Sequence, residues 1–380
     1  MASKCAQKES LYYAVLEFIF KYLPGLLLGL CSLAVFVNLF LLLITTIGIR
    51  RKKVPAKRLL FVANRSVVDA IAAAVSLVYL YKVEIQCDVV ECKTVAFVPD
   101  IAMQLIVTFN YWMLAGSYFG IGMLTFYAVR TPLQYKLSLN VARVAKFIAL
   151  GWVVMIGLLC LVVFATEQQT MFDSNGMMYM MRNQYYGLLG EWMVALCEKV
   201  IDKSMMETGA ISLILPICSY VTTLLSYGFV ALVLFRRRQD RRNVSSLNRD
   251  HTAIWRLGVH LGVFTFSFCL MAVAYAATFP MAESCFNWSE LLMENHQATI
   301  DGHNVDDDNC SLEHLYAFTR YAVLTSLASI GWFLRMSLDP LIDTVLDTHI
   351  RRLVIAPRPL ERASTTMLLE NRLSNDTGKA

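Results

Sequence analysis

Charged residues are scarce in this chain: of its 380 residues only 17% are charged, while 57% are hydrophobic. A soluble domain cannot keep so much apolar surface out of water, which excludes the ordinary water-soluble classes and indicates a membrane protein. The net charge of +5 does not indicate a nucleic-acid-binding protein, because the basic residues lie beside apolar runs rather than in one patch.

Lysine and arginine are absent between residues 280 and 316, where eight acidic residues occur. Residues 50–58, in contrast, hold six basic residues and no acidic one. Loops rich in Lys and Arg are retained in the cytoplasm when a chain enters a bilayer. Over all connections, 17 basic residues fall on one side and 5 on the other. This alternation predicts an N-terminus outside the cell and a C-terminus inside it.

Long apolar runs are abundant. A helix needs about 20 apolar residues to cross about 30 Å of hydrocarbon. Seven stretches meet this length, at about residues 23–48, 59–81, 101–129, 147–166, 208–235, 257–280 and 320–342. We therefore predict an all-α membrane protein, with an extracellular N-terminus (1–22), a seven-transmembrane helix bundle (23–343), and a cytoplasmic helix with a disordered tail (344–380). A short amphipathic eighth helix is expected at about 341–353, lying on the membrane.

Four charged side chains stand out inside predicted spans, where charge is costly and marks buried functional sites. Arg65 and Asp69 are four residues apart and share one helical face, and Arg335 and Asp339 repeat this spacing. We expect the two pairs to neutralise each other between the second and seventh spans, as a polar switch. The alternative for Arg65 is that it snorkels to the cytoplasmic interface near Arg58.

His260 is the one histidine within a predicted span. It has no His or Glu partner at ligand spacing in its own helix, so we interpret it as a core or interfacial histidine. The sequence thus predicts no metal site and no cofactor, and the protein is not expected to be an enzyme.

Six sequence features lie along the predicted spans and in the loop after the third span. They are Asn38, the segment Asn64 to Asp69, the segment Pro132 to Tyr135, Trp152, Pro216, and the segment Asp339 to Asp343. In this order and on these spans, the set resembles the rhodopsin-like (class A) family of G-protein-coupled receptors, over roughly residues 25–355. The divergent pattern is similar to that of the orphan and chemosensory receptors of nematodes.

The resemblance implies a multi-pass receptor of the plasma membrane, which transmits the signal of an unknown extracellular ligand to a heterotrimeric G protein. On the third span it implies ligand contacts at Gln104, Thr108 and Asn110. It also adds Asn38 to the polar switch formed around Asp69, Arg335 and Asp339.

The chain departs from the family pattern at several positions. The family's Asp-Arg-Tyr triplet falls on Leu124, Thr125 and Phe126, which with Arg130 would form the transducer face. The tyrosine that ends the last motif is replaced by Asp343.

A further departure concerns the sodium ion that the family holds with the carboxylate at the position of Asp69. Arg335 lies one helical turn before Asp339 in this chain. We hypothesise that its guanidinium takes the place of the ion.

Six cysteines fall in segments predicted to be outside, namely Cys5, Cys87, Cys92, Cys197, Cys285 and Cys310. The exterior permits disulfides, and six cysteines allow 15 pairings. We favour a bridge from Cys92 or Cys87 to Cys197 and one from Cys285 to Cys310, with unpaired thiols as the alternative. Asn287 and Asn309 lie in glycosylation sequons on the same side.

Two other classes of function remain open. The missing Asp-Arg-Tyr triplet leaves room for a seven-span protein that binds a ligand or partner without coupling to a G protein. A transporter would be expected to contain internal repeats, and none is evident in the sequence.

Overall fold

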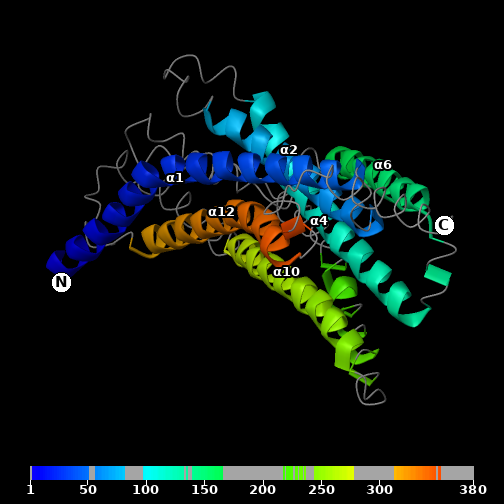
Figure 1. Cartoon of the computed structure of the whole chain (residues 1–380). Helices are drawn as coiled ribbons and strands as arrows, with labels where there is room; N and C mark the ends of the chain where they lie inside the picture. The colour runs from blue at the N-terminus through cyan, green and yellow to red at the C-terminus, as the bar shows by residue number, and fades with distance from the viewer. Residues whose placement is uncertain are drawn as a thin grey trace, which may run out of the picture.

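The structure is a computed structural model, and it describes residues 2–50, 56–81, 97–131, 139–165, 244–277 and 312–347, with short pieces at 134–135, within 217–236 and at 350–351. Six long elements are formed by this part, and all are α-helices (Figure 1). They are α1 (Ala2–Arg50), α2 (Ala56–Tyr81), α4 (Phe97–Arg130), α6 (Val141–Ala165), α10 (Val244–Ala276) and α12 (Leu312–Leu346).

The helix α12 occupies the middle of this arrangement. α1 and α10 pack against it, α1 also packs against α2, and α2 packs against α4. α6 lies against α2 and α4 at the periphery. The core between these helices is rich in aromatic side chains, among which the largest fully buried ones are Trp112, Trp332, Tyr111, Tyr118, Phe264, Phe318 and Phe333.

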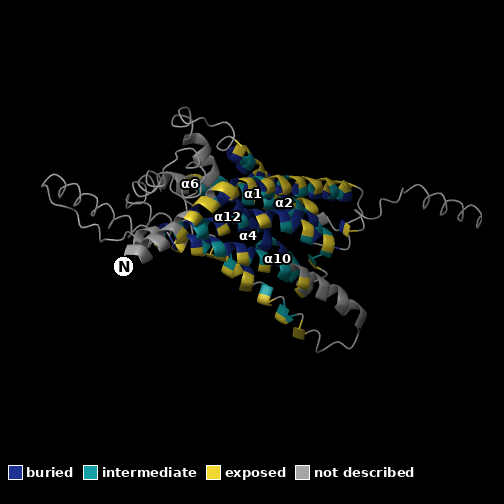
Figure 2. Ribbon diagram, turned by 90° about the vertical axis from the view of Figure 1, so that its left-hand side faces the viewer, coloured by how far each residue is buried: buried dark blue, intermediate teal, exposed yellow. Residues whose placement is uncertain are grey.

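The outer faces of the helices are apolar as well as the core. Phe36 of α1 and Phe147 and Val153 of α6 are each more than three-fifths exposed. Figure 2 shows exposed residues along the outer side of α1 and buried ones where α2, α4 and α12 meet. Apolar faces of this kind are stable against lipid tails and not against water.

Four helical stretches of the described part are long and apolar enough to cross a membrane: Ala14–Arg50, Lys57–Tyr81, Val141–Leu161 and Tyr316–Leu346. Shorter apolar helices occur at Tyr220–Val233 and Gly258–Ala274. α4 and α10 are not among the four. The structure thus supports an all-helical membrane protein with four candidate spans, while the count of seven and the orientation stay predictions.

The helices extend beyond the stretches expected from hydrophobicity. α1 has 49 residues, and at about 1.5 Å per residue its length is more than twice the roughly 30 Å of hydrocarbon. It begins at Ala2, so residues 2–22, expected to precede the first span, belong to the same helix. The candidate span within this helix, Ala14–Arg50, begins before residue 23, where the first span was expected.

Pro340 lies inside α12, although proline has no N–H for the helical ladder. The bond that it cannot donate would have gone to the carbonyl of Met336, four residues earlier. Asn38 of α1 supplies the missing donor, since its Nδ2 lies 2.9 Å from the Met336 carbonyl oxygen. The helix therefore passes through the proline without leaving a buried carbonyl unpaired.

The expected eighth helix does not begin at residue 341. Residues 341–346 continue α12 rather than starting a separate helix on the membrane, so the expected start at residue 341 was wrong. The break falls at Asp347, and helical structure is described again at Ile350 and Arg351. Asp347 fits the start of a new turn, because its Oδ1 accepts from the Ile350 N–H at 3.4 Å.

The contact between Asn38 and Met336 yields a stability prediction. Asn38→Ala leaves the Met336 carbonyl without a donor and should cost about 1–3 kcal/mol. In a Pro340→Ala background the backbone N–H of residue 340 satisfies that carbonyl, so the same substitution should cost clearly less. Thermal unfolding of the four purified proteins in detergent measures this double-mutant cycle. Equal costs in both backgrounds would contradict the assigned role of Asn38.

Candidate functional site

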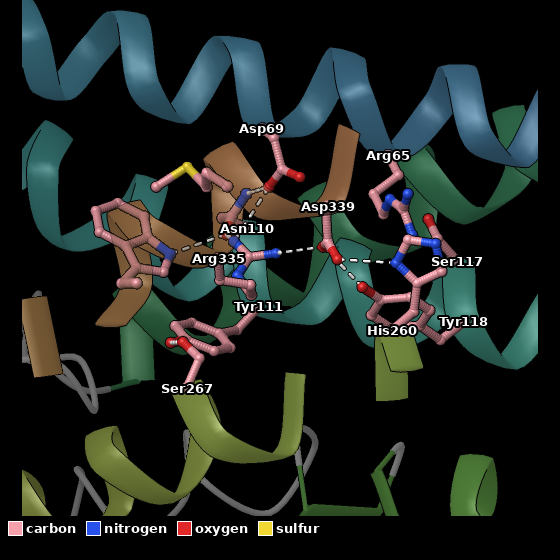
Figure 3. A network of polar contacts seen from close by, with 12 residues as sticks. Arg65, Asp69, Asn110, Tyr111, Ser117, Tyr118, His260, Ser267, Arg335 and Asp339 are labelled. Carbon is pink, nitrogen blue, oxygen red and sulfur yellow. Dashed lines mark hydrogen bonds and ion pairs between the residues drawn. The ribbon is translucent and has the colours of Figure 1, made fainter. Parts of the chain in front are cut away.

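One face of α12 carries a stripe of four buried polar side chains, Trp332, Arg335, Asp339 and Asp343. Their spacing of three to four residues aligns them along the helix axis. The stripe is about 16 Å long at about 1.5 Å per residue, which is about half of the hydrocarbon thickness. Side chains from α2, α4 and α10 point toward it, and together they form the polar network of Figure 3.

Arg335 is the centre of the first half of the network. Its Nη2 donates to the Asn110 Oδ1 at 2.6 Å and to the Asp69 Oδ1 at 3.1 Å. Asn110 in turn donates from Nδ2 to Asp69 at 2.8 Å, and its Oδ1 also accepts from the indole N–H of Trp332 at 3.0 Å. The Nη1 of Arg335 lies 3.7 Å from the Asp339 Oδ2. This half joins α2, α4 and α12 through one guanidinium.

Asp339 and Asp343 organise the second half. The Tyr118 hydroxyl donates to the Asp339 Oδ2 at 2.7 Å. The His260 ring of α10 lies between the two carboxylates, with Nδ1 3.0 Å from the Asp339 Oδ1 and Nε2 3.0 Å from the Asp343 Oδ1. Arg65 of α2 donates from Nη2 to Asp343, and its guanidinium lies over the Tyr118 ring, 5.4 Å from the centroid. All four helices therefore meet at this half.

The sequence predicted that the pair Arg65 and Asp69 would neutralise the pair Arg335 and Asp339. All four residues lie in one network, but this exchange of partners occurs only between Arg335 and Asp69. Arg335 contacts Asp69 on α2 and Asp339 on its own helix. Arg65 is paired with Asp343, not with Asp339. It is only 1% exposed, so the alternative that it snorkels to the interface was wrong. Asn38 contacts the backbone of α12 beside the network.

Sequence reasoning missed three residues of the network, namely Tyr118, His260 and Asp343. The interpretation of His260 as a core histidine is confirmed by its burial, but its carboxylate partners, Asp339 and Asp343, lie on α12 and not on its own helix. A usable signal was present on α12, where Asp343 continues the four-residue spacing of Arg335 and Asp339. Such a ladder predicts a polar face that other helices must neutralise.

Neutral hydrogen bonds hold α6 beside the network. The Trp152 indole N–H donates to the Asn64 Oδ1 at 2.7 Å, and the Asn64 Nδ2 donates to the Ser117 Oγ at 3.0 Å. Phe109 packs against the Trp152 ring at 5.3 Å between centroids. Two residues singled out by the resemblance thus connect α2, α4 and α6.

The expected ligand contacts on α4 have different surroundings. Asn110 is engaged in the network by Asp69, Arg335 and Trp332. Thr108 is fully buried, and its Oγ1 has no hydrogen-bond partner among the described residues. The side chain of Gln104 lies outside the part that the structure describes.

The expected transducer face lies at the end of α4 and is largely apolar. The Phe126 ring packs edge-on against Phe229, with the centroids 5.2 Å apart. The exposed Arg130 lies over the same ring at 5.8 Å. Leu124 is partly buried, and the Thr125 hydroxyl bonds within α4 to the Ile121 carbonyl at 2.8 Å. An aromatic contact therefore stands where the family places charge.

The loop after α4 is tied to the start of α2. The Lys57 Nζ donates to the Tyr135 carbonyl at 3.1 Å and lies over the Tyr135 ring, 4.5 Å from its centroid. Burial raises the pKa of the Tyr135 hydroxyl, because the phenolate is less well hydrated there. The neutral tyrosine thus remains the form that packs against Lys57.

Several predictions concern residues outside the described part of the chain. These are the disulfide candidates Cys92, Cys197, Cys285 and Cys310, the glycosylation candidates Asn287 and Asn309, and the fifth-span Pro216. They stay predictions. Among the described residues, no group of three or more His, Cys, Asp or Glu side chains is arranged to hold a metal ion.

Comparison with known proteins gives one informative match. No protein-family model matches the chain. A curated protein of Caenorhabditis elegans, uncharacterized protein ZC21.6, is 29% identical over 385 residues, which cover 98% of this chain and 86% of that protein. The aligned region therefore covers almost the whole chain and is not limited to one segment.

Removal of the central guanidinium tests the network. Arg335→Ala leaves Asp69 and Asp339 buried without their shared partner and should cost about 3–5 kcal/mol of stability. The double variant Asp69→Asn/Arg335→Ala should be more stable than Arg335→Ala alone, because one unpaired charge is gone. Thermal unfolding in detergent measures both effects. Arg320→Ala on the exposed face of α12 is the matched control and should change stability little.

An Arg335→Ala protein as stable as the Arg320→Ala control would refute the central position of Arg335. Independent, additive effects of Asp69→Asn and Arg335→Ala would refute the pairing of these two residues.

Proposed function

We propose that this protein is a seven-span receptor of the plasma membrane that transmits the signal of an extracellular ligand to a heterotrimeric G protein. The polar network is the observation that carries the proposal. Ionisable groups buried in a membrane bundle are expensive and are found where function requires them. This network joins α2, α4, α10 and α12, so a change at any one helix alters the partners of the others.

A signal needs an element with two discrete arrangements and a ligand that prefers one of them. The network fits that requirement because its groups can exchange partners. Asp339 lies within reach of Arg335, Tyr118 and His260, and Asp343 lies within reach of Arg65 and His260. A small rotation of α10 or α12 would favour one partner of Asp339 over another.

The positions on which the resemblance rests also support the proposal. Asn38, Asn64, Trp152 and Asp339 each take part in a hydrogen bond between helices. The sequence pattern alone indicated these four positions, and they fall at contacts between different pairs of helices. The ligand side of the proposal has no such support, since the connections expected outside the cell lie beyond the described residues.

A second candidate is a seven-span protein that binds a ligand or partner without coupling to a G protein. The packing of Phe126 against Phe229 favours it, because this aromatic contact replaces the charged triplet of the resembled family. At the position of the family's triplet arginine this chain has Thr125, which offers no guanidinium to a G protein.

Recruitment assays separate the two candidates. The full chain would be expressed in cells with a panel of Gα subunits and arrestin, with and without ligand libraries. The receptor proposal expects recruitment of at least one Gα subunit, and altered basal recruitment in an Arg335→Ala variant at equal surface expression. Absence of recruitment under every condition would favour the second candidate.

The response to sodium tests the hypothesis that Arg335 takes the place of an ion. The Nη2 of Arg335 is 3.1 Å from the Asp69 carboxylate, so a cation already occupies the position that sodium would need. Exchange of sodium chloride for choline chloride at constant ionic strength should leave the melting temperature of the purified protein unchanged. A clear sodium-dependent shift of the wild-type protein would show that the hypothesis is wrong.

A further inference from the structure

The position of His260 between two carboxylates has a consequence for the proton that the ring carries. Its two nitrogens each lie 3.0 Å from a carboxylate oxygen, Nδ1 from Asp339 and Nε2 from Asp343. A neutral imidazole has one N–H and one lone pair, so it can donate to only one of them. The other nitrogen would then direct its lone pair at a carboxylate oxygen, which is repulsive.

An imidazolium removes this conflict, since both of its nitrogens are donors. The competing arrangement uses Arg65, whose Nη1 lies 3.4 Å from Nδ1 and would donate to a neutral ring. That contact is longer than the one to Asp339, and it leaves the facing Asp339 oxygen without a donor. The shorter pair of contacts therefore favours the imidazolium.

The charges of the network agree with this assignment. Two arginines, Arg65 and Arg335, stand beside three carboxylates, Asp69, Asp339 and Asp343. A neutral histidine leaves this set with one excess negative charge, and an imidazolium makes it neutral. A net charge inside a low-dielectric bundle is costly, so the neutral set is the more stable one.

The groups that face His260 come from each neighbouring helix of the described part. α12 supplies Asp339 and Asp343, α2 supplies Arg65, and α4 supplies the Tyr118 ring at 6.2 Å between centroids. On α10 itself the next turn presents Phe264, which is apolar and packs against Tyr118. The two carboxylates are therefore the groups that accept hydrogen bonds from the protonated ring.

We propose that His260, Asp339 and Asp343 form a buried proton-binding site that holds α10 to α12, and that loss of the proton weakens this contact. Deprotonation turns one of the two His260 contacts into a repulsion and adds a net negative charge to the network. The protonated form is thus the one that stabilises the packed bundle. Stability should be highest at low pH and should fall as rising pH removes the proton.

The proposal makes α10 the helix whose attachment to α12 depends on pH. The contacts of α2 and α4 with α12 use arginine, which keeps its charge, or neutral donors such as Tyr118. This property belongs to the folded bundle and does not require coupling to a G protein, so it stands or falls separately from the receptor proposal.

A spectroscopic experiment tests the site directly. The full chain, labelled with ¹⁵N in its histidines and purified in detergent, would be examined by NMR between about pH 6 and about pH 9. One histidine should show two protonated nitrogens at neutral pH, and this signal should be missing in His260→Gln. A neutral imidazole for His260 at neutral pH would overturn the proposal.

Two further variants keep the test decisive should His260→Gln fail to fold. Asp343→Asn removes one carboxylate, so the imidazolium signal should disappear at lower pH than in the wild type. Thr344→Val is the control beside it, since the Thr344 hydroxyl bonds within α12 to the Pro340 carbonyl at 2.7 Å. An Asp343→Asn protein with the same histidine titration as Thr344→Val would also overturn the proposal.

The melting temperature provides a second readout. In the wild type it should decrease by several degrees as the pH is raised through the loss of the imidazolium signal. His260→Gln should melt lower than the wild type at about pH 6 and approach it at about pH 9, because the contribution of the proton is then lost in both. A difference between the two proteins that is constant over this range would count against the proton-binding site.

Discussion

An arginine inside a bilayer-spanning bundle cannot give up its charge, and the arrangement around α12 depends on this constraint. Arg335 is fully surrounded by protein, so a carboxylate has to come to it from another helix. Asp69 does so from α2, and Asn110 of α4 bridges the two. The positions of α2 and α4 relative to α12 are therefore set by electrostatic partners as well as by apolar packing, which by itself is weakly directional in lipid.

The proline of α12 adds a second constraint of the same kind. Arg335 needs an acceptor from outside α12, and the Met336 carbonyl, which Pro340 leaves unpaired, needs a donor. The two residues are adjacent in the chain. Asn38 meets the second need from α1, on the side where Asp69 meets the first from α2. One turn of α12 thus makes polar contacts with two neighbouring helices, α1 and α2.

Much of this arrangement follows from sequence, but the partners across helices do not. Four-residue spacing placed Arg65 with Asp69 and Arg335 with Asp339 on shared faces, because it depends only on the geometry of one helix. Whether Arg65 meets Asp339 or Asp343 depends on a shift of one turn between α2 and α12, which no single-helix pattern contains. The carboxylate partners of His260 on α12 could not be predicted for the same reason. Helix ends also exceeded the apolar runs, since hydrophobicity marks where lipid ends and not where hydrogen bonding ends.

The contacts of α12 differ in how easily they can be broken. Separating Arg335 from Asp69 would leave a buried guanidinium without a carboxylate, and the guanidinium has no low-cost neutral form. The polar contact of α1 with α12 is the neutral hydrogen bond from Asn38. A conformational change that broke this bond would have to replace it. His260 can lose its charge without any helix moving first, and it joins α10 to α12 through Asp339 and Asp343. A rearrangement of the bundle that began with proton loss would therefore loosen the polar contact of α10 before those of α1, α2 or α4, while the aromatic cluster of Phe264, Tyr111 and Phe268 would still hold α10 to α4.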